Sequence, residues 1–159
     1  MTDKNQAMID YLMTCKTIKD NPLFFNYVDA KNNSKQLITS ASDTITDKRY
    51  IDGSVLRKYT CTIIDFKSIA TNAVVNTAGY SDENVEDMNS VQQIINWVTD
   101  QNKKHHYPDF GPNCVVQEIK ALTTTPRLGG IDNQASPPLV QYTVTIRVDY
   151  LDKSDMLWK

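Results

Sequence analysis

The sequence lacks the features that mark membrane, exported and nucleic-acid-binding proteins. None of its apolar runs approaches the ~20 residues that cross a bilayer. The polar residues 1–6 also lack the apolar region of a signal peptide. The net charge is only −2 and the basic residues are scattered, so no broad nucleic-acid surface is expected. We therefore expect a protein that is made and kept in the cytoplasm, unless it assembles into a particle that leaves the cell.

Cysteine and glycine are also scarce. Cys15, Cys61 and Cys114 are odd in number, widely spaced and without a CxxC pair, so neither a disulfide framework nor a zinc site is indicated. We expect three reduced thiols, at least two of them in the core. The five glycines form no GxGxxG, P-loop or GxSxG motif. The pair Gly129-Gly130 is most simply a flexible turn.

Apolar periodicity predicts two helices. The first is capped by Thr2 or Asp3 and runs to about Asp20. The second begins with the polar residues 81–83 and ends with the basic residues 103–104, which suits the helix dipole at both ends. Their apolar faces consist of Met8, Tyr11, Leu12, Cys15 and Ile18 in the first helix, and of Val85, Met88, Val91, Ile94, Ile95 and Val98 in the second.

Strands account for most of the remaining chain. They are expected at residues 23–28, 36–40, 44–50, 55–66, 114–123 and 140–150. The last one alternates strictly between apolar and polar residues, so one face belongs to the core and the other meets solvent or a partner. Residues 124–138 read as a long irregular segment, which in a small domain is usually functional or mobile. The fold class is therefore α+β: a single domain, residues 1–159, in which two main helices pack on one face of an antiparallel sheet.

One segment invites a catalytic or metal interpretation. His105 and His106 are followed by Asp109, but they are the only histidines, and adjacent histidines rarely point to one site. A solvated helix C-terminus explains them more simply. Asp109-Phe110-Gly111 spells the magnesium-binding triplet of protein kinases, yet the chain is too short and lacks the other kinase motifs. We predict no enzyme activity, no catalytic residues, no metal and no cofactor.

The order of several short motifs resembles that of the small tail-terminator or tail-completion proteins of long-tailed phages, often labelled minor capsid proteins. The resemblance covers roughly residues 8–152, and the order and spacing of the motifs carry it. The motifs are Leu23-Phe24-Phe25, Tyr50-Ile51-Asp52-Gly53-Ser54, Asp82-Glu83-Asn84-Val85-Glu86, Ile95-Asn96-Trp97-Val98, Tyr107-Pro108-Asp109-Phe110, Thr125-Pro126-Arg127-Leu128 and Val148-Asp149-Tyr150-Leu151-Asp152.

This resemblance implies a structural virion protein located in the tail or neck and made in the host cytoplasm. Copies of the chain would form a ring, commonly of six, that caps the tail tube and joins it to the head-connector or neck proteins. DNA would pass through the ring without specific binding, which the near-neutral charge of the chain permits.

A ring needs two different surfaces on each subunit. The segments that could supply them are residues 29–35, 51–54 and 128–138. The candidate interface residues are Ile51, Asp52, Gly53, Ser54, Leu128, Gly129, Gly130, Ile131 and Trp158. We also expect Arg57, Lys58 and Thr60 to point outward from the strand that follows the Asp52-Gly53 turn.

Three alternatives remain open. The chain could be another neck or head-completion protein. It could be a monomeric binding module that acts through residues 124–138. From a different class, it could be a small metal-dependent or acyl-transfer enzyme that uses His105, His106 and Asp109.

Overall fold

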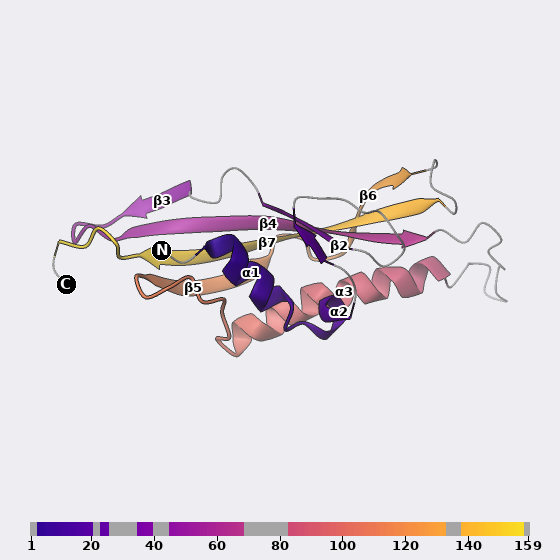
Figure 1. Cartoon of the computed structure of the whole chain (residues 1–159), viewed down its shortest axis with the longest axis horizontal. Helices are drawn as coiled ribbons and strands as arrows, with labels where there is room; N and C mark the ends of the chain where they lie inside the picture. Colours follow the sequence, from indigo (N-terminus) through magenta and orange to yellow (C-terminus); the bar gives the residue numbers. More distant parts are fainter. Residues whose placement is uncertain are drawn as a thin grey trace.

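A long β-sheet with helices on one face forms the molecule (Figure 1). The computed structural model describes residues 3–20, 23–25, 35–39, 45–68, 83–132 and 138–157. The described strands are β1 (Leu23–Phe25), β2 (Lys35–Thr39), β3 (Ile45–Arg49), β4 (Val55–Ser68), β5 (Cys114–Ala121), β6 (Arg127–Asp132) and β7 (Leu139–Asp152). The α+β prediction is confirmed.

Two strands of fourteen residues, β4 and β7, form the centre of the sheet. They pair antiparallel without a break, from Val55 opposite Asp152 to Ser68 opposite Leu139. On the outer side of β4, β3 pairs with its beginning and β2 with its later part. On the outer side of β7, β6 pairs with its beginning and β5 with its end. All these pairs are antiparallel, and among the described strands the short β1 alone pairs parallel, with β2.

The predicted alternation of the last strand is confirmed. Along β7 every second residue is buried, and the opposite partners of these residues on β4 are largely buried as well. Because the strand period is two, the intervening residues face the other side of the sheet. The residues of this ladder that belong to the main core cluster are Tyr59, Cys61, Ile63, Val140, Tyr142, Val144, Ile146, Val148 and Tyr150.

The prediction of a single first helix is wrong, because the structure has two short helices in this segment. α1 (Lys4–Leu12) ends in a turn, and α2 (Lys16–Lys19) follows it. The side chain of Asp3 caps α1 by accepting a hydrogen bond from Asn5 N. Cys15 has extended backbone angles and starts α2 without a side-chain cap. The apolar stripe continues across this break, so its periodicity did not reveal the turn.

The second predicted helix is α3 (Glu83–Lys103), and it ends before Pro108 as expected. His106 N donates to the carbonyl of Gln101 and His105 N to that of Asn102, while His105 has a positive φ of 55°. These bonds form a Schellman-type stop with histidine in the left-handed position. Pro108 follows after α3 has already ended.

Among the described side chains of α3, the buried ones are those of Val91, Ile94, Ile95 and Val98. Met88 was expected on the buried face but is 41% exposed. The short α2 packs against α3 near Gln93, whose side chain accepts a hydrogen bond from the hydroxyl of Thr17. Val85 is in α3, but its side chain lies outside the described ones.

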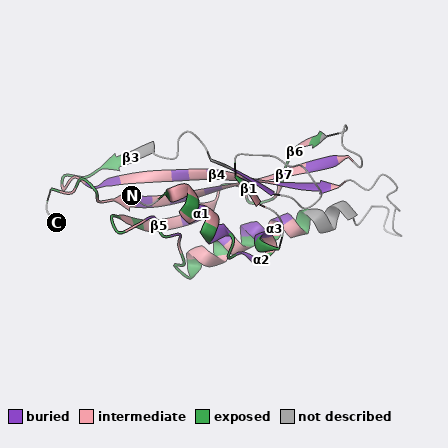
Figure 2. Ribbon diagram, in the orientation of Figure 1, coloured by how far each residue is buried: buried purple, intermediate pink, exposed green. Residues whose placement is uncertain are grey.

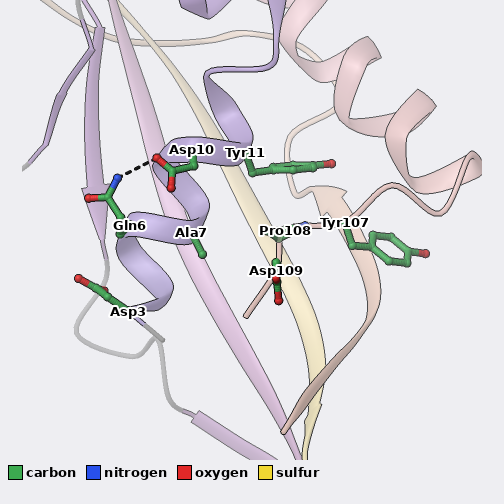
Figure 3. A pocket seen from close by; sticks show the side chains of 8 residues that line it. All are labelled: Asp3, Gln6, Ala7, Asp10, Tyr11, Tyr107, Pro108 and Asp109. Atoms are coloured by element: carbon green, nitrogen blue, oxygen red, sulfur yellow. Dashed lines mark hydrogen bonds between the residues drawn. The ribbon is translucent and has the colours of Figure 1, made fainter. Parts of the chain in front are cut away.

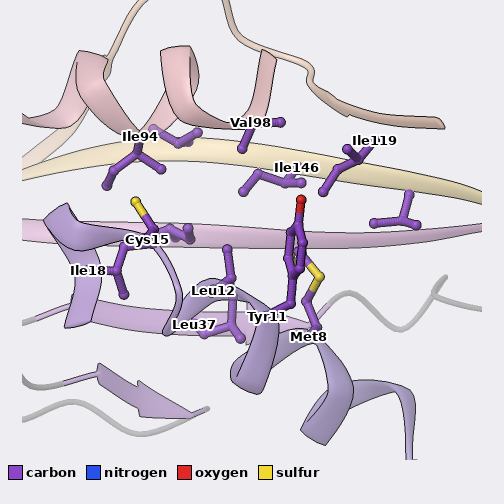
Figure 4. Close-up of a cluster of buried hydrophobic side chains, with 14 of the residues drawn as sticks. Met8, Tyr11, Leu12, Cys15, Ile18, Leu37, Ile94, Val98, Ile119 and Ile146 are labelled. Atoms are coloured by element: carbon purple, nitrogen blue, oxygen red, sulfur yellow. The ribbon is translucent and has the colours of Figure 1, made fainter. Parts of the chain in front are cut away.

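The core lies between the helices and the covered face of the sheet. Figure 2 shows buried residues along the middle of β4 and β7 and on the inner side of α3. In Figure 4, Met8, Leu12 and Ile18 of α1 and α2 point toward the sheet, as Ile94 and Val98 of α3 do. Phe110 joins this core by packing edge-on against the rings of Tyr59 and Tyr150.

Two strand predictions differ from the structure. Residues 127–132, expected to be irregular, form β6 on β7, because even Gly129 and Gly130 supply the backbone groups that a ladder needs. Lys35, expected in a loop, begins β2 and is fully buried. The expected strand at residues 23–28 is described only for its first three residues, as β1.

The three cysteines are reduced, and Cys15 and Cys61 are buried, as predicted. Burial raises the pKa of the Cys61 thiol to about 12, and it also raises that of Cys15. Burial also raises the pKa of Cys114, but this thiol is only half-buried and can be reached from solvent. Because thiolates are the reactive form, we expect an alkylating reagent at pH 8 to modify Cys114 of the folded protein well before the other two.

Intact-mass measurement over time would follow this labelling. Urea-unfolded protein is the control, in which all three thiols should react at similar rates. Modification of Cys15 or Cys61 as fast as Cys114 in the folded state would contradict the packing of α2 and β4.

Candidate interaction surfaces

The Asp52-Gly53 turn connects β3 to β4 at one end of the sheet. Tyr50 N donates to the carbonyl of Ser54, and Gly53 N to that of Tyr50. One carboxylate oxygen of Asp52 accepts hydrogen bonds from both the backbone N and the hydroxyl of Ser54, at 2.9 and 2.6 Å. These bonds lower the pKa of Asp52, since they favour its charged form. The turn is therefore held by its own side chains.

The C-terminal segment holds the same turn from outside. Leu157 N donates to the carbonyl of Asp52 at 2.9 Å. Gly53 has a φ of +86°, and a Cβ atom at this position would lie 2.3 Å from the carbonyl oxygen of Asp155. Glycine is therefore required here for two reasons, its backbone conformation and the close approach of a second chain segment.

This rigid turn displays an apolar side chain. Ile51 is 98% exposed, and Leu157 beside it is 68% exposed. Tyr50 is also exposed and carries the ammonium of Lys48 over its ring, 5.1 Å from the centroid. An isoleucine this exposed on a pre-ordered turn is more typical of a contact site than of a folding requirement. We call residues 48–51 together with Leu157 the tip.

The second predicted segment, residues 128–131, lies on β6. Leu128 and Ile131 are 56% and 52% exposed, and a register shift separates Leu128 from Gly130 in the pairing with β7. Gly129 lies close to Thr143 of β7, whereas a Cβ atom on Gly130 would meet nothing within 4 Å. The segment is thus an edge strand with two exposed aliphatic side chains, rather than a flexible loop.

The tip and β6 lie at opposite ends of the sheet (Figure 1). β3 pairs with β4 at residues 55–58, and β6 pairs with β7 at residues 139–143. Between these ends lies the ladder of fourteen residues, which at about 3.3 Å per residue is roughly 45 Å long. The structure therefore separates the two predicted segments and does not combine them into one site.

The remaining predicted interface residues are described only in part. Trp158 and residues 29–34 and 133–137 lie outside the described residues. The prediction that Arg57, Lys58 and Thr60 all point outward is wrong for Arg57. It lies on the same face as Tyr59 and forms an ion pair with Asp152, 3.0 Å from Nε to the carboxylate. Neighbouring strand residues alternate between faces, so Arg57 and Lys58 cannot share one.

The histidine segment does not converge on one point. The Nδ1 atom of His105 lies 3.1 Å from the hydroxyl of Tyr107, and the backbone carbonyl of His106 accepts from the hydroxyl of Tyr11. The carboxylate of Asp109 accepts from its near neighbour, Gly111 N. Within the described part of the chain, no three His, Cys, Asp or Glu side chains are grouped so that they could hold a metal ion.

A buried charge cluster was not predicted. Asp65 lies between Lys35 and Lys67, with Nζ-to-carboxylate distances of 3.4 and 3.6 Å, and all three side chains are almost completely buried. Burial raises the pKa of Asp65 and lowers that of Lys35, because each charge is removed from water. The signal was present in β4, since residues 65 and 67 continue the odd-numbered positions at which Tyr59, Cys61 and Ile63 are buried.

A groove beside α1 was also missed. It has a volume of about 430 Å³ and lies between α1 and residues 107–109. Figure 3 shows Ala7 and Tyr11 on one side and Pro108 on the other, with three carboxylates around them, those of Asp3, Asp10 and Asp109. No Lys, Arg or His is among the described residues that line it. Only the folded chain brings these two segments together, so no local pattern indicated the groove.

Comparison with known proteins does not assign the chain to a family. No protein-family model matches the chain, and no curated protein matches it. Among the helices of the described residues, none is both long and apolar enough to cross a membrane. The resemblance to tail terminators therefore depends on the motifs in the sequence.

The turn geometry predicts the effect of a methyl group at Gly53. We expect Gly53→Ala to lower the free energy of unfolding by at least about 1–2 kcal/mol, because the left-handed conformation and the contact with Asp155 both oppose it. Gly130→Ala is the matched control and should change stability by less than about 0.5 kcal/mol, since nothing lies near its Cβ position. Urea unfolding measures both, and equal effects would contradict this description of the turn.

The buried cluster predicts a non-additive stability effect. We expect Asp65→Leu to lower the free energy of unfolding by about 3–5 kcal/mol, because two lysines remain buried without their carboxylate. Replacing the cluster together, by Lys35→Met, Asp65→Leu and Lys67→Met, should recover most of this loss, since no charge is then buried. Urea unfolding of the single and triple variants tests this. A triple variant no more stable than Asp65→Leu would mean that the charges themselves stabilise the fold.

Proposed function

We propose that this protein is a structural component of a long-tailed phage particle, namely the tail terminator. In this proposal, copies of the chain form a closed ring, with six as the number that the resemblance suggests. The ring caps the finished tail tube and provides the surface to which the head-connector or neck proteins bind. DNA passes through it without specific contacts, and the protein catalyses no reaction.

The observation that carries the proposal is the placement of two different exposed apolar surfaces at opposite ends of one rigid ladder. The tip presents Ile51 and Leu157, and β6 presents Leu128 and Ile131. A ring is built from heterologous contacts, in which one surface of a subunit binds a different surface of the next. A subunit with one exposed patch would instead favour a two-fold dimer. The arrangement thus supports a head-to-tail assembly, and the motif order supports a tail protein.

The construction of the turn supports the same proposal. Asp52, Ser54 and the C-terminal segment fix the conformation in which Ile51 is displayed. A contact residue that is ordered before binding loses less conformational entropy on association. The motif Tyr50-Ile51-Asp52-Gly53-Ser54, which contributes to the resemblance, therefore has a physical role that suits a contact between proteins.

Electron microscopy of particles from a phage that lacks this gene tests the proposal. We expect tails of uncontrolled length, or tails that are not joined to heads, because nothing caps the tail tube. Supplying the intact gene in the host should restore joined virions of normal tail length. Normal, infectious virions in the absence of the gene would overturn the proposal.

A double replacement, His105→Ala with His106→Ala, separates this function from the enzyme alternative. Supplied in the host in place of the intact gene, it should restore particles as well as the intact gene does, because both imidazoles are exposed at the end of α3. Loss of particles with this variant, in a chain that still folds, would instead favour a role for the histidine segment.

A further inference from the structure

The proposed function does not use the groove beside α1, which has a volume of about 430 Å³. Its floor is apolar, formed by Ala7, Tyr11 and Pro108. In the part of the chain that the structure describes, the hydrogen bonds of the three surrounding carboxylates come from neutral groups. Asp3 accepts from Asn5 N, Asp10 from the amide of Gln6, and Asp109 from Gly111 N. The groove therefore suits an apolar side chain that is accompanied by positive charge.

The tip of the same chain has this combination. Ile51 is almost fully exposed, and Lys48 and Arg49 precede it by two or three residues. Both basic side chains are exposed, and the ammonium of Lys48 lies over the ring of Tyr50. Among the acidic residues near the tip, Asp47 precedes Lys48 in β3, the carboxylate of Asp52 is bonded to Ser54, and Asp155 belongs to the C-terminal segment packed against Gly53. The tip itself, residues 48–51 and Leu157, thus combines exposed apolar side chains with two exposed basic ones.

We propose that the tip of one copy docks into the groove beside α1 of the next copy. Ile51 would contact the apolar floor, with Lys48 and Arg49 facing the carboxylates of Asp10 and Asp109. This inference rests on the proposed ring, and it assigns the contact between subunits to the tip and the groove rather than to the tip and β6. Charge complementarity selects the occupant, since the other exposed segment, β6, carries a single basic residue, Arg127, beside Leu128.

The positions of the two surfaces suit repeated assembly. The groove lies over the part of the sheet where the hydroxyl of Tyr59 donates to Asn5 of α1, whereas the tip lies beyond the start of β4 at Val55. A copy bound through its tip therefore still has its own groove available. Such a contact extends from copy to copy, and it closes into a ring when the rotation per copy permits.

Disulfide cross-linking between two single-cysteine variants tests the contact. Ile51→Cys on the tip is mixed with Gln6→Cys in the groove, both in a Cys114→Ser background because the other two native cysteines are buried. Under mild oxidation, we expect this pair to form a mixed dimer at least ~tenfold faster than Ile51→Cys mixed with Thr124→Cys, since docking raises the local concentration of the two thiols. Non-reducing electrophoresis with intact-mass measurement identifies the product.

The alternative surface is the matched comparison. Leu128→Cys mixed with Gln6→Cys should react no faster than the Thr124→Cys control. If this pair reacts fast and the Ile51→Cys pair does not, the groove binds β6 and the docking of the tip is overturned. If neither pair exceeds the control at high protein concentration, the groove is not a contact between copies. The gene-deletion experiment tests the tail-terminator function independently of these cross-linking results.

Charge reversal gives a second test on folded variants. Lys48→Glu with Arg49→Glu should slow the cross-link ~tenfold or more, and so should Asp10→Lys alone. Placing the tip reversal in one partner and Asp10→Lys in the other should recover most of the rate, because opposite charges again face each other. A combination as slow as the single changes would overturn the pairing of these charges. Circular dichroism of each variant confirms that it is folded.

Discussion

The continuous pairing of β4 with β7 is the constraint on which the rest of the structure depends. Because every residue from Val55 to Ser68 has an opposite partner, a shift of one residue would exchange the core face with the other face along the whole ladder. This register places Tyr59 and Tyr150 around Phe110, and thereby the connection from α3 to β5 that forms one wall of the groove. It also sets the distance between the tip and β6. The two exposed surfaces are therefore fixed relative to each other.

The ends of the ladder and its middle are stabilised differently. In the middle, apolar side chains of α1, α2 and α3 cover one face of the sheet. At the tip, the contacts are mostly polar and local, and the C-terminal segment adds a backbone hydrogen bond to the carbonyl of Asp52. The buried Lys35, Asp65 and Lys67 lie on the covered face toward the other end. Because these charges are removed from water, the cluster lowers the stability of the fold, and the surrounding apolar packing offsets this loss. We find no role for it in the proposed assembly.

Much of the fold could be predicted because each main element has a hydrophobic pattern with a single period, either that of a strand or that of a helix. The strict alternation of β7 and the apolar stripe of α3 each allow one interpretation. The break between α1 and α2 could not be seen, since Cys15 and Ile18 stay on the core side after the turn. β6 was missed because glycine and proline near Gly129 suggested a loop, whereas pairing with β7 uses only backbone groups. At the candidate site, the Asp52-Gly53 turn was recognisable from adjacent residues. The groove was not, because it combines Asp3 and Asp10 with Asp109, about a hundred residues away in the chain.

We propose that copies of this chain form a closed ring at the head-proximal end of a phage tail. Electron cryomicroscopy of intact virions, focused on the junction of head and tail, tests this proposal. We expect a single closed ring at this junction into which the β4–β7 ladder and α3 fit once per subunit, with each β3–β4 turn against the neighbouring subunit. A junction whose rings all fit other proteins, with this fold absent from the virion, would contradict it.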